Sequence, residues 1–273
     1  MQLNRRYRLA LNLLIVFPVL SLLTACGGQV TLQGKEDELA SKKVTLGDEV
    51  VYPNDRPSVP DGKLVWLDQK NNCASCHGTD GSTAVGPKNI KLSDKGYMRL
   101  QKPVDQYSFI WFGKDPEGKP VNHPTVREKL SRREAWSLVF YLRSLAIPPL
   151  NTYGETDVAE LDAVFGSNCA VCHGKKGNGD GPLAHSLEPQ PANFQTFARF
   201  YDRTDAVLWD HIANGIPWEG MPNFLGKEDK AKKVKISEDY VWKLVQYVRN
   251  FQETTDALAV NPAPKTETKN PIR

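Results

Sequence analysis

Two five-residue segments combine a pair of cysteines with a histidine in the order Cys-x-x-Cys-His. They span residues 73–77 and 169–173. This spacing suits covalent attachment of a haem, because the thiols can add to its vinyl groups as thioethers while the adjacent histidine binds the iron. A zinc site with four thiolates, or a redox disulfide, is the alternative, but both leave the histidines unexplained. The pattern predicts two covalently bound haems c, attached at Cys73, Cys76, Cys169 and Cys172, with His77 and His173 as iron ligands.

The fifth cysteine, Cys26, ends a stretch that has the anatomy of an export signal. Three arginines lie within residues 5–8, and a mostly apolar run follows over 9–23. A retained membrane anchor is the alternative, but the run is interrupted and falls short of the roughly 20 apolar residues that a span needs. Residues 1–25 are therefore predicted to be a signal peptide that is removed. Residues 23–26 resemble a bacterial lipobox, which implies a lipid on Cys26 that anchors the protein to a membrane in the periplasm.

The charge balance excludes one class of partner. The whole chain has 35 Lys and Arg against 32 Asp and Glu, for a net charge of +3. The predicted signal peptide holds three arginines and no acidic residue, so the processed chain is neutral. Haem propionates add negative charge to it. A neutral or acidic protein lacks the basic surface on which nucleic-acid binding depends, so we expect protein partners and no nucleic acid.

The rest of the chain repeats one pattern twice. A short helical segment (62–71, then 156–167) leads into each Cys-x-x-Cys-His segment, a Gly/Pro-rich loop follows, and an amphipathic helix closes the unit. A capping box of Ser131 and Glu134 predicts the start of the first closing helix, and Ser237 caps the second. Four residues of the first closing helix recur 106 positions later: Ser131, Trp136, Tyr141 and Arg143 match Ser237, Trp242, Tyr247 and Arg249. The aromatic residues among them predict core packing against the haem and the opening helix.

This pattern resembles the class I cytochromes c, over about residues 61–251. The resemblance implies an all-α fold of two tandem class I cytochrome c domains, each wrapping one covalent haem. It also implies that the carbonyls of Pro87 and Pro182 accept the imidazole N–H of the adjacent iron ligand. The predicted organisation is a signal peptide (1–25), a tether (26–60), domain 1 (61–147), a linker (148–155), domain 2 (156–251) and a disordered tail (252–273).

The sixth iron ligand of domain 2 is predicted to be Met221. This residue lies 48 positions after His173 in a Gly/Pro-rich loop that resembles the methionine loop of the family. A core methionine is the alternative, since methionine often fills gaps in cores. A thioether ligand stabilises Fe(II) and raises the reduction potential.

Domain 1 has no methionine in the corresponding loop. His123-Pro124 stands where Met221-Pro222 stands, 46 positions after His77, so His123 is the predicted sixth ligand. Two imidazoles favour Fe(III), which gives this haem the lower potential. Met98 and an open coordination site are the alternatives.

Two functions compete. The first is electron transfer by a membrane-tethered dihaem cytochrome, a carrier or a subunit of a membrane respiratory complex, in a respiratory or photosynthetic chain with unknown donor and acceptor. The second is a dihaem redox enzyme of the peroxidase or thiosulfate-oxidising kind. Such enzymes need an iron that opens to substrate or an unusual ligand such as cysteine, whereas each domain here offers a sixth ligand and no cysteine is spare. The sequence therefore favours a carrier over an enzyme.

Overall fold

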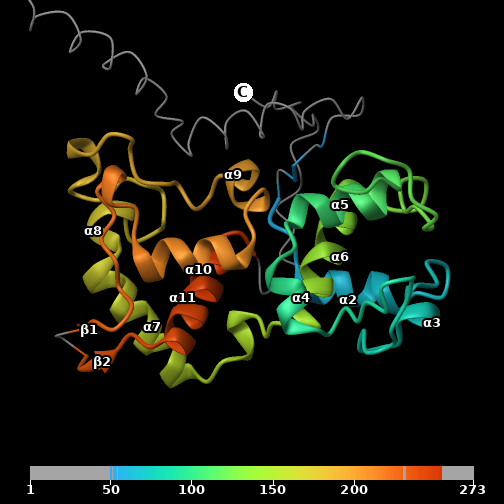
Figure 1. Cartoon of the computed structure of the whole chain (residues 1–273), viewed down its shortest axis with the longest axis horizontal. Helices are drawn as coiled ribbons and strands as arrows, with labels where there is room; N and C mark the ends of the chain where they lie inside the picture. The colour runs from blue at the N-terminus through green and yellow to red at the C-terminus, as the bar shows by residue number, and fades with distance from the viewer. Residues whose placement is uncertain (1–49, 51, 54, 230–231, 254–273) are drawn as a thin grey trace, which may run out of the picture. The chain divides into compact units, whose positions relative to one another are not determined.

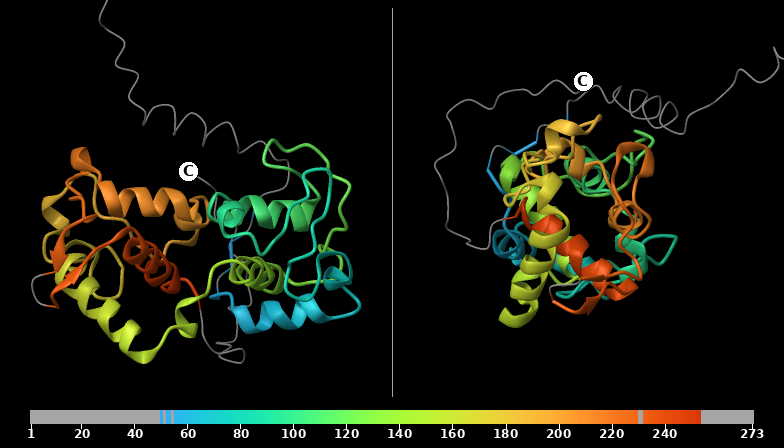
Figure 2. Two further views of the ribbon diagram at one scale, coloured as in Figure 1. Left: turned by 60° about the horizontal axis from the view of Figure 1, so that its bottom comes forward. Right: turned by 90° about the vertical axis from the view of Figure 1, so that its left-hand side faces the viewer.

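The computed structural model describes residues 50, 52–53, 55–229 and 232–253, which belong to a compact unit beginning at Val50. Helices dominate this part of the chain, and α2 to α6 and α7 to α11 form two successive groups (Figures 1 and 2). The predicted signal peptide, Cys26 and most of the predicted tether lie outside the described residues. Among the described helices, none is long and apolar enough to cross a membrane.

The first group forms domain 1. Its helices are α2 (Val59–Leu67), α3 (Cys73–His77), α4 (Lys95–Arg99), α5 (Pro103–Phe112) and α6 (Arg132–Ser144). A short 3-10 turn, η2 (Leu150–Thr152), lies in the connection to the second group. The Leu150 side chain is buried, so this connection packs against the core as it crosses.

The second group forms domain 2. Its helices are α7 (Glu155–Asn168), α8 (Ala170–His173), α9 (Phe197–Tyr201), α10 (Asp205–Asn214) and α11 (Glu238–Asn250). Two further 3-10 turns and two short strands complete it: η3 (Ala184–Ser186), η4 (Pro217–Glu219), β1 (Glu228–Asp229) and β2 (Val234–Lys235).

Three helices of domain 1 recur in domain 2 with the same lengths. Helices α4 and α9 have five residues each, α5 and α10 have ten, and α6 and α11 have thirteen. The first two pairs are separated by 102 positions and the third by 106. The tandem repeat expected from the sequence is therefore present in the structure, and residues at these offsets occupy equivalent positions.

The predicted caps of the closing helices are confirmed. The Glu134 backbone N–H donates to Ser131 Oγ (3.3 Å), and the Ser131 N–H donates to Glu134 Oε2 (2.8 Å), which completes the capping box. Ser237 Oγ accepts from the Tyr240 N–H at the start of α11. Helix α6 packs closely on α2, where a Cβ at Gly62 would overlap the Ser137 carbonyl. Only glycine allows the two helices to approach so closely.

The lysine-rich segment between Met221 and α11 adds a small hairpin to domain 2. Strands β1 and β2 pair antiparallel, with Asp229 opposite Val234. The Asp229 carboxylate is 3% exposed and accepts from Ser167 Oγ and Asn168 Nδ2, both at 2.7 Å. Because these two residues end α7, directly before Cys169, the hairpin is fixed beside the second haem-attachment segment.

Two predicted boundaries need correction, and one predicted core residue has further contacts. The sequence predicts a tether that ends at residue 60, but residues before it already belong to domain 1. Ser58 is buried and caps α2, and Tyr52 stacks on Trp136 with ring centroids 5.7 Å apart. The predicted tail was to begin at 252, but Gln252 is buried and donates to the Phe194 carbonyl. Trp136 is in the core as expected, yet its ring stacks on Tyr107 of α5 and lies 4.5 Å from Tyr201 of domain 2.

Candidate haem sites

Both Cys-x-x-Cys-His segments fold as short helical turns. Helix α3 holds Cys73, Cys76 and His77, and residues three and four apart share one face of a helix, so both thiols and the imidazole project from the same side. Helix α8 follows Cys169 directly and ends at His173. All four thiols are free, which does not match the disulfide interpretation. Within the described ranges, no three His, Cys, Asp or Glu side chains converge as a metal-ion site, so the zinc interpretation has no support either.

Burial affects two of the four thiols of these segments. Burial raises the pKa of Cys73. Burial and, to a smaller extent, the neighbouring Cys172 raise the pKa of Cys169 to about 12. A thiol with a raised pKa remains protonated at neutral pH and is a poor nucleophile for disulfide exchange.

The two histidine rings of domain 1 lie close together. The ring centroids of His77 and His123 are 6.1 Å apart, and the ring planes are tilted by 47°. Trp66 lies 5.7 Å from the His77 ring, and Phe109 lies 4.8 Å from the His123 ring. Burial lowers the pKa of both histidines, and for His77 the His123 ring adds to this effect. Both rings are therefore neutral at pH 7, the form that binds a metal.

The separation of these rings fits one iron between them. A histidine nitrogen binds a metal at about 2.0 Å and lies about 1.1 Å from its ring centre, so two axial imidazoles have centroids roughly 6.2 Å apart. The observed 6.1 Å between His77 and His123 agrees with this arrangement. Each Nδ1 is buried with no hydrogen-bond partner among the described residues.

The loop that carries His123 is anchored to the end of α5. The Val121 N–H donates to the Gly113 carbonyl (2.8 Å), and the Val126 N–H donates to the Ile110 carbonyl (2.9 Å). Lys114 and Pro120 form an isolated antiparallel bridge across the base of the loop. These backbone contacts fix both ends of the loop that carries His123 to α5 and to each other.

The loop that carries Met221 is anchored to the end of α10 in the same way. Met221 and Ile216 exchange backbone hydrogen bonds of 3.1 and 2.9 Å, and the Phe224 N–H donates to the Ile212 carbonyl (3.1 Å). Gly215 has φ +75°, and a Cβ there would lie 2.6 Å from the Met221 carbonyl oxygen. This close approach requires glycine.

His123 and Met221 stand at equivalent places in these loops. Ile110 and Ile212 are 102 positions apart in equivalent helices, and each accepts from a loop N–H three residues after the candidate ligand. The backbone hydrogen bonds thus align a histidine in domain 1 with a methionine in domain 2. The sequence match of His123-Pro124 with Met221-Pro222 agrees with this alignment.

His173 is oriented by a backbone carbonyl, but not the one expected. Its Nδ1 lies 3.0 Å from the Ala192 carbonyl oxygen, whereas the carbonyl of Pro182 was predicted as the acceptor. A carbonyl can only accept, so Nδ1 carries the proton and Nε2 keeps its lone pair for a metal. Phe194 instead stacks on the His173 ring, with centroids 4.4 Å apart.

This contact had no signal in the sequence, because a backbone acceptor has no characteristic side chain. The Phe194 N–H donates to the Gly177 carbonyl (2.6 Å), which holds the segment with Ala192 against the His173 ring. In domain 1 the prediction for Pro87 also fails, because His77 Nδ1 has no hydrogen-bond partner among the described residues.

Met98 lies apart from the domain 1 histidines. It is fully buried and forms a separate cluster with Ala146 and Ile147 near the end of α6. Its sulfur accepts a hydrogen bond from Gln106 Nε2 at 3.0 Å. These contacts are those of a core methionine, whereas His123 lies opposite His77.

Two family models match the chain, one in each domain. Residues 60–146 match the cytochrome c family, and residues 156–248 match the family described as cytochrome c oxidase, cbb3-type, subunit III. The chain therefore contains two cytochrome c domains in tandem, and this implies covalent binding of haem c.

The chain is also similar to several curated proteins. It is 33% identical over 161 residues to the cbb3-type cytochrome c oxidase subunit FixP of Azorhizobium caulinodans, a match that covers 57% of this chain and 50% of that protein. It is 29% identical over 175 residues to FixP of Bradyrhizobium sp. (strain ORS 278), covering 58% and 54%. The chain thus spans about half the length of these relatives.

Among solved structures, a chain of the reducing HAO-like protein complex Kustc0457/Kustc0458 of Kuenenia stuttgartiensis aligns with 22% identity. The alignment covers 73% of this chain and 100% of that one, with a TM-score of 0.29.

Proposed function

We propose that this chain, with its two tandem cytochrome c domains, passes single electrons between two covalently attached haems of unequal potential. When bound, haem supplies reversible one-electron exchange between Fe(III) and Fe(II). The residues of the chain attach the two haems, supply their axial ligands and exclude water around them. The observation that carries this proposal is the 6.1 Å separation of the His77 and His123 rings.

In domain 1, Cys73 and Cys76 would form the thioethers to haem, and His77 and His123 would ligate its iron. The anchoring of the His123 loop supports this assignment, because the ring is positioned by backbone hydrogen bonds of its own loop. A ligand that is already in place needs little rearrangement between the two oxidation states. That property suits electron transfer.

In domain 2, Cys169 and Cys172 would form the thioethers to haem, and His173 and Met221 would ligate its iron. The hydrogen bond between His173 Nδ1 and the Ala192 carbonyl supports the role of His173, since it leaves Nε2 for the iron. The equivalence of the His123 and Met221 loops supports the role of Met221. Methionine ligation raises the potential relative to two histidines, so the electron favours domain 2.

A dihaem enzyme is the less favoured function. Such an enzyme needs an iron position open to its substrate. His123 lies opposite His77 and Met221 occupies the equivalent loop position, which supports six-coordinate iron in both domains.

The protein acts at a membrane, tethered in the periplasm by a lipid on Cys26 after removal of residues 1–25. The names of the relatives describe them as subunits of a cbb3-type cytochrome c oxidase. By analogy, the partner of this chain is a membrane respiratory complex, to which it delivers electrons or from which it accepts them. The absence of excess positive charge in the processed chain fits protein partners and no nucleic acid.

The test is a redox titration of the full-length holoprotein, following the visible and near-infrared ligand bands of each haem. The expected result is two separate one-electron steps, with a methionine band only on the higher one. Two methionine-type haems would refute His123 as a ligand. A high-spin haem that binds cyanide rapidly would instead favour the enzyme.

A further inference from the structure

The two cytochrome c domains contact each other through equivalent residues. Tyr201 of domain 2 packs on Trp136 of domain 1, with ring centroids 4.5 Å apart. Arg99 of domain 1 lies over Trp242 of domain 2, with its guanidinium carbon 3.5 Å from the ring centroid. Arg99 and Tyr201 each end an equivalent helix, and the two tryptophans are also equivalent. Each domain thus offers the same patch to the other, as in a two-fold symmetric dimer.

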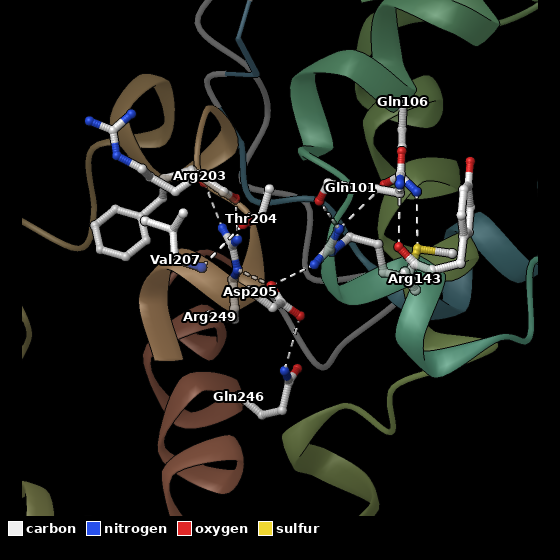
Figure 3. A network of polar contacts seen from close by, with 12 residues as sticks. Gln101, Gln106, Arg143, Arg203, Thr204, Asp205, Val207, Gln246 and Arg249 are labelled. Atoms are coloured by element: carbon white, nitrogen blue, oxygen red, sulfur yellow. Dashed lines mark hydrogen bonds and ion pairs between the residues drawn. The ribbon is translucent and has the colours of Figure 1, made fainter. Parts of the chain in front are cut away.

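A buried carboxylate, Asp205, lies at this junction between two equivalent arginines (Figure 3). Arg143 Nη2 and Arg249 Nε contact Asp205 Oδ1 at 2.5 and 3.0 Å. Each arginine also donates to an equivalent carbonyl of its own domain: Arg143 to Gln101 at 3.1 Å and Arg249 to Arg203 at 2.5 Å. Each arginine therefore hydrogen-bonds to the backbone of its own domain, and both form ion pairs with the same acidic residue, Asp205.

This charge cluster is shielded from water and is asymmetric. Arg143, Asp205 and Arg249 are 7%, 1% and 3% exposed. Asp205 begins α10, but Pro103 begins the equivalent helix α5, so a single carboxylate serves both arginines. The two arginines keep the pKa of Asp205 below its usual range although burial acts in the opposite direction. Among the described residues, Asp205 is the only carboxylate that forms an ion pair with Arg143. Separating the domains would break this ion pair.

The cluster is also linked to the iron ligand of domain 2. Arg249 Nη1 donates to the Phe200 carbonyl at 2.6 Å. The Phe200 ring packs on Phe194, with centroids 5.2 Å apart, and Phe194 stacks on His173. A short series of contacts therefore leads from the junction to the imidazole that binds haem 2.

We propose that Asp205 is a positioning residue for electron exchange between the two haems. By binding the equivalent arginines of both domains, it holds the domains in one orientation and sets the distance between the haems. Domains in one chain tend to move relative to each other unless contacts between them hold one orientation, and the buried ion pair adds such a contact to the aromatic ones. The inference rests on the proposed electron-transfer function and adds to it the group that fixes the geometry.

The test compares three variants of the full-length holoprotein with the parent. Arg143→Gln removes the contact that crosses from domain 1 and leaves the Asp205–Arg249 pair within domain 2. Arg143→Lys keeps the charge. Asp202→Asn is the matched control, because it removes the Lys102–Asp202 ion pair, which also joins the domains at 2.9 Å but is about 30% exposed.

Two measurements are made on each variant: the first-order rate of electron equilibration between the haems after flash reduction, and the small-angle X-ray scattering profile. For Arg143→Gln we expect unchanged ligand bands and potentials, a broader distance distribution and a rate reduced severalfold, because electron transfer slows as two haems move apart. Arg143→Lys should recover part of the rate, and Asp202→Asn should match the parent.

Three results would overturn the inference: a parental rate in Arg143→Gln, a broadened distance distribution with no change in rate, or equal losses in Arg143→Gln and Asp202→Asn. If Arg143→Gln does not fold, Arg143→Lys decides: a slower rate together with a broader distance distribution supports the inference, and any other combination of the two refutes it. Failure of the proposed function is a separate result. It would appear in the ligand bands of the parent, which are recorded before any variant is compared with it.

Discussion

His123 and Met221 stand at the same position in equivalent loops. In each loop, the backbone N–H three residues later donates to a carbonyl of the preceding helix, that of Ile110 in domain 1 and that of Ile212 in domain 2. One backbone arrangement thus presents an imidazole in domain 1 and a thioether in domain 2. If both side chains bind iron as proposed, the type of side chain at this position contributes to the potential difference between the haems. Replacing His123 by methionine, or Met221 by histidine, should therefore change the ligand band and the reduction potential of that haem.

The first prediction concerns His123→Met. It should replace the bis-histidine bands of domain 1 with a methionine band and raise the lower potential by on the order of 0.1 V, a fraction of the roughly 0.8 V that axial ligands span. The near-infrared spectrum and a redox titration measure both effects. His185→Met, the same substitution at an exposed histidine, is the control and should change neither. Unchanged bands in His123→Met would exclude His123 as a ligand.

The second prediction concerns Met98, the alternative ligand of domain 1. Met98→Leu keeps the volume of a fully buried side chain but removes the acceptor of the Gln106 hydrogen bond. It should lower the free energy of unfolding by about 1–2 kcal/mol, measured by chemical denaturation. Both haem spectra should remain as in the parent. A haem that became high-spin in this variant would show that Met98 binds iron.

Much of each domain could be predicted from local patterns. The capping box of Ser131 and Glu134 involves residues three positions apart, so the sequence alone indicates it. The alignment of His123 with Met221 follows from the repeat and from the proline after each residue. These signals depend on neighbours along the chain, which is why the sequence is enough to identify them.

Contacts between the domains could not be predicted in this way. The match of Arg143 with Arg249 was visible as a repeat, but their shared partner Asp205 depends on how two folded domains dock. Trp136 was assigned to the core of its own domain, because helical periodicity shows that a face is buried and not which surface covers it. The acceptor for His173 Nδ1 is the backbone carbonyl of Ala192, and every residue has such a carbonyl, so no residue type in the sequence indicates it.

The third prediction tests the close approach in the Met221 loop. Gly215 and Gly226 have similar φ values, +75° and +79°, but only Gly215 has backbone atoms where a Cβ would lie, with the Asn223 nitrogen at 2.7 Å. Gly226→Ala should cost about 1 kcal/mol, the price of a positive φ for alanine. Gly215→Ala should cost clearly more and weaken the methionine band, because the loop must shift. Equal effects in denaturation and near-infrared spectra would contradict this account of the loop.

The fourth prediction concerns the pH dependence of stability. Glu253 lines the same small cavity as Arg143, Asp205 and Arg249. Burial, together with the charge of Asp205, raises the pKa of Glu253 to about 7, although the two arginines oppose this shift. An unfolded chain titrates glutamate near pH 4.3. Between about pH 4.3 and 7 the folded protein therefore retains a proton that the unfolded chain has lost, and the contribution of Glu253 to stability falls as pH rises.

Glu253→Gln removes this titration. The free energy of unfolding of the variant should therefore rise relative to that of the parent from pH 4.5 to pH 7, and the difference should stay constant above pH 7. Chemical denaturation of the holoprotein at several pH values measures the difference. The exposed Glu128→Gln is the control and should follow the parent across the range. A Glu253→Gln variant that loses stability relative to the parent as pH rises would show that the folded protein favours the charged carboxylate, with the arginines outweighing burial.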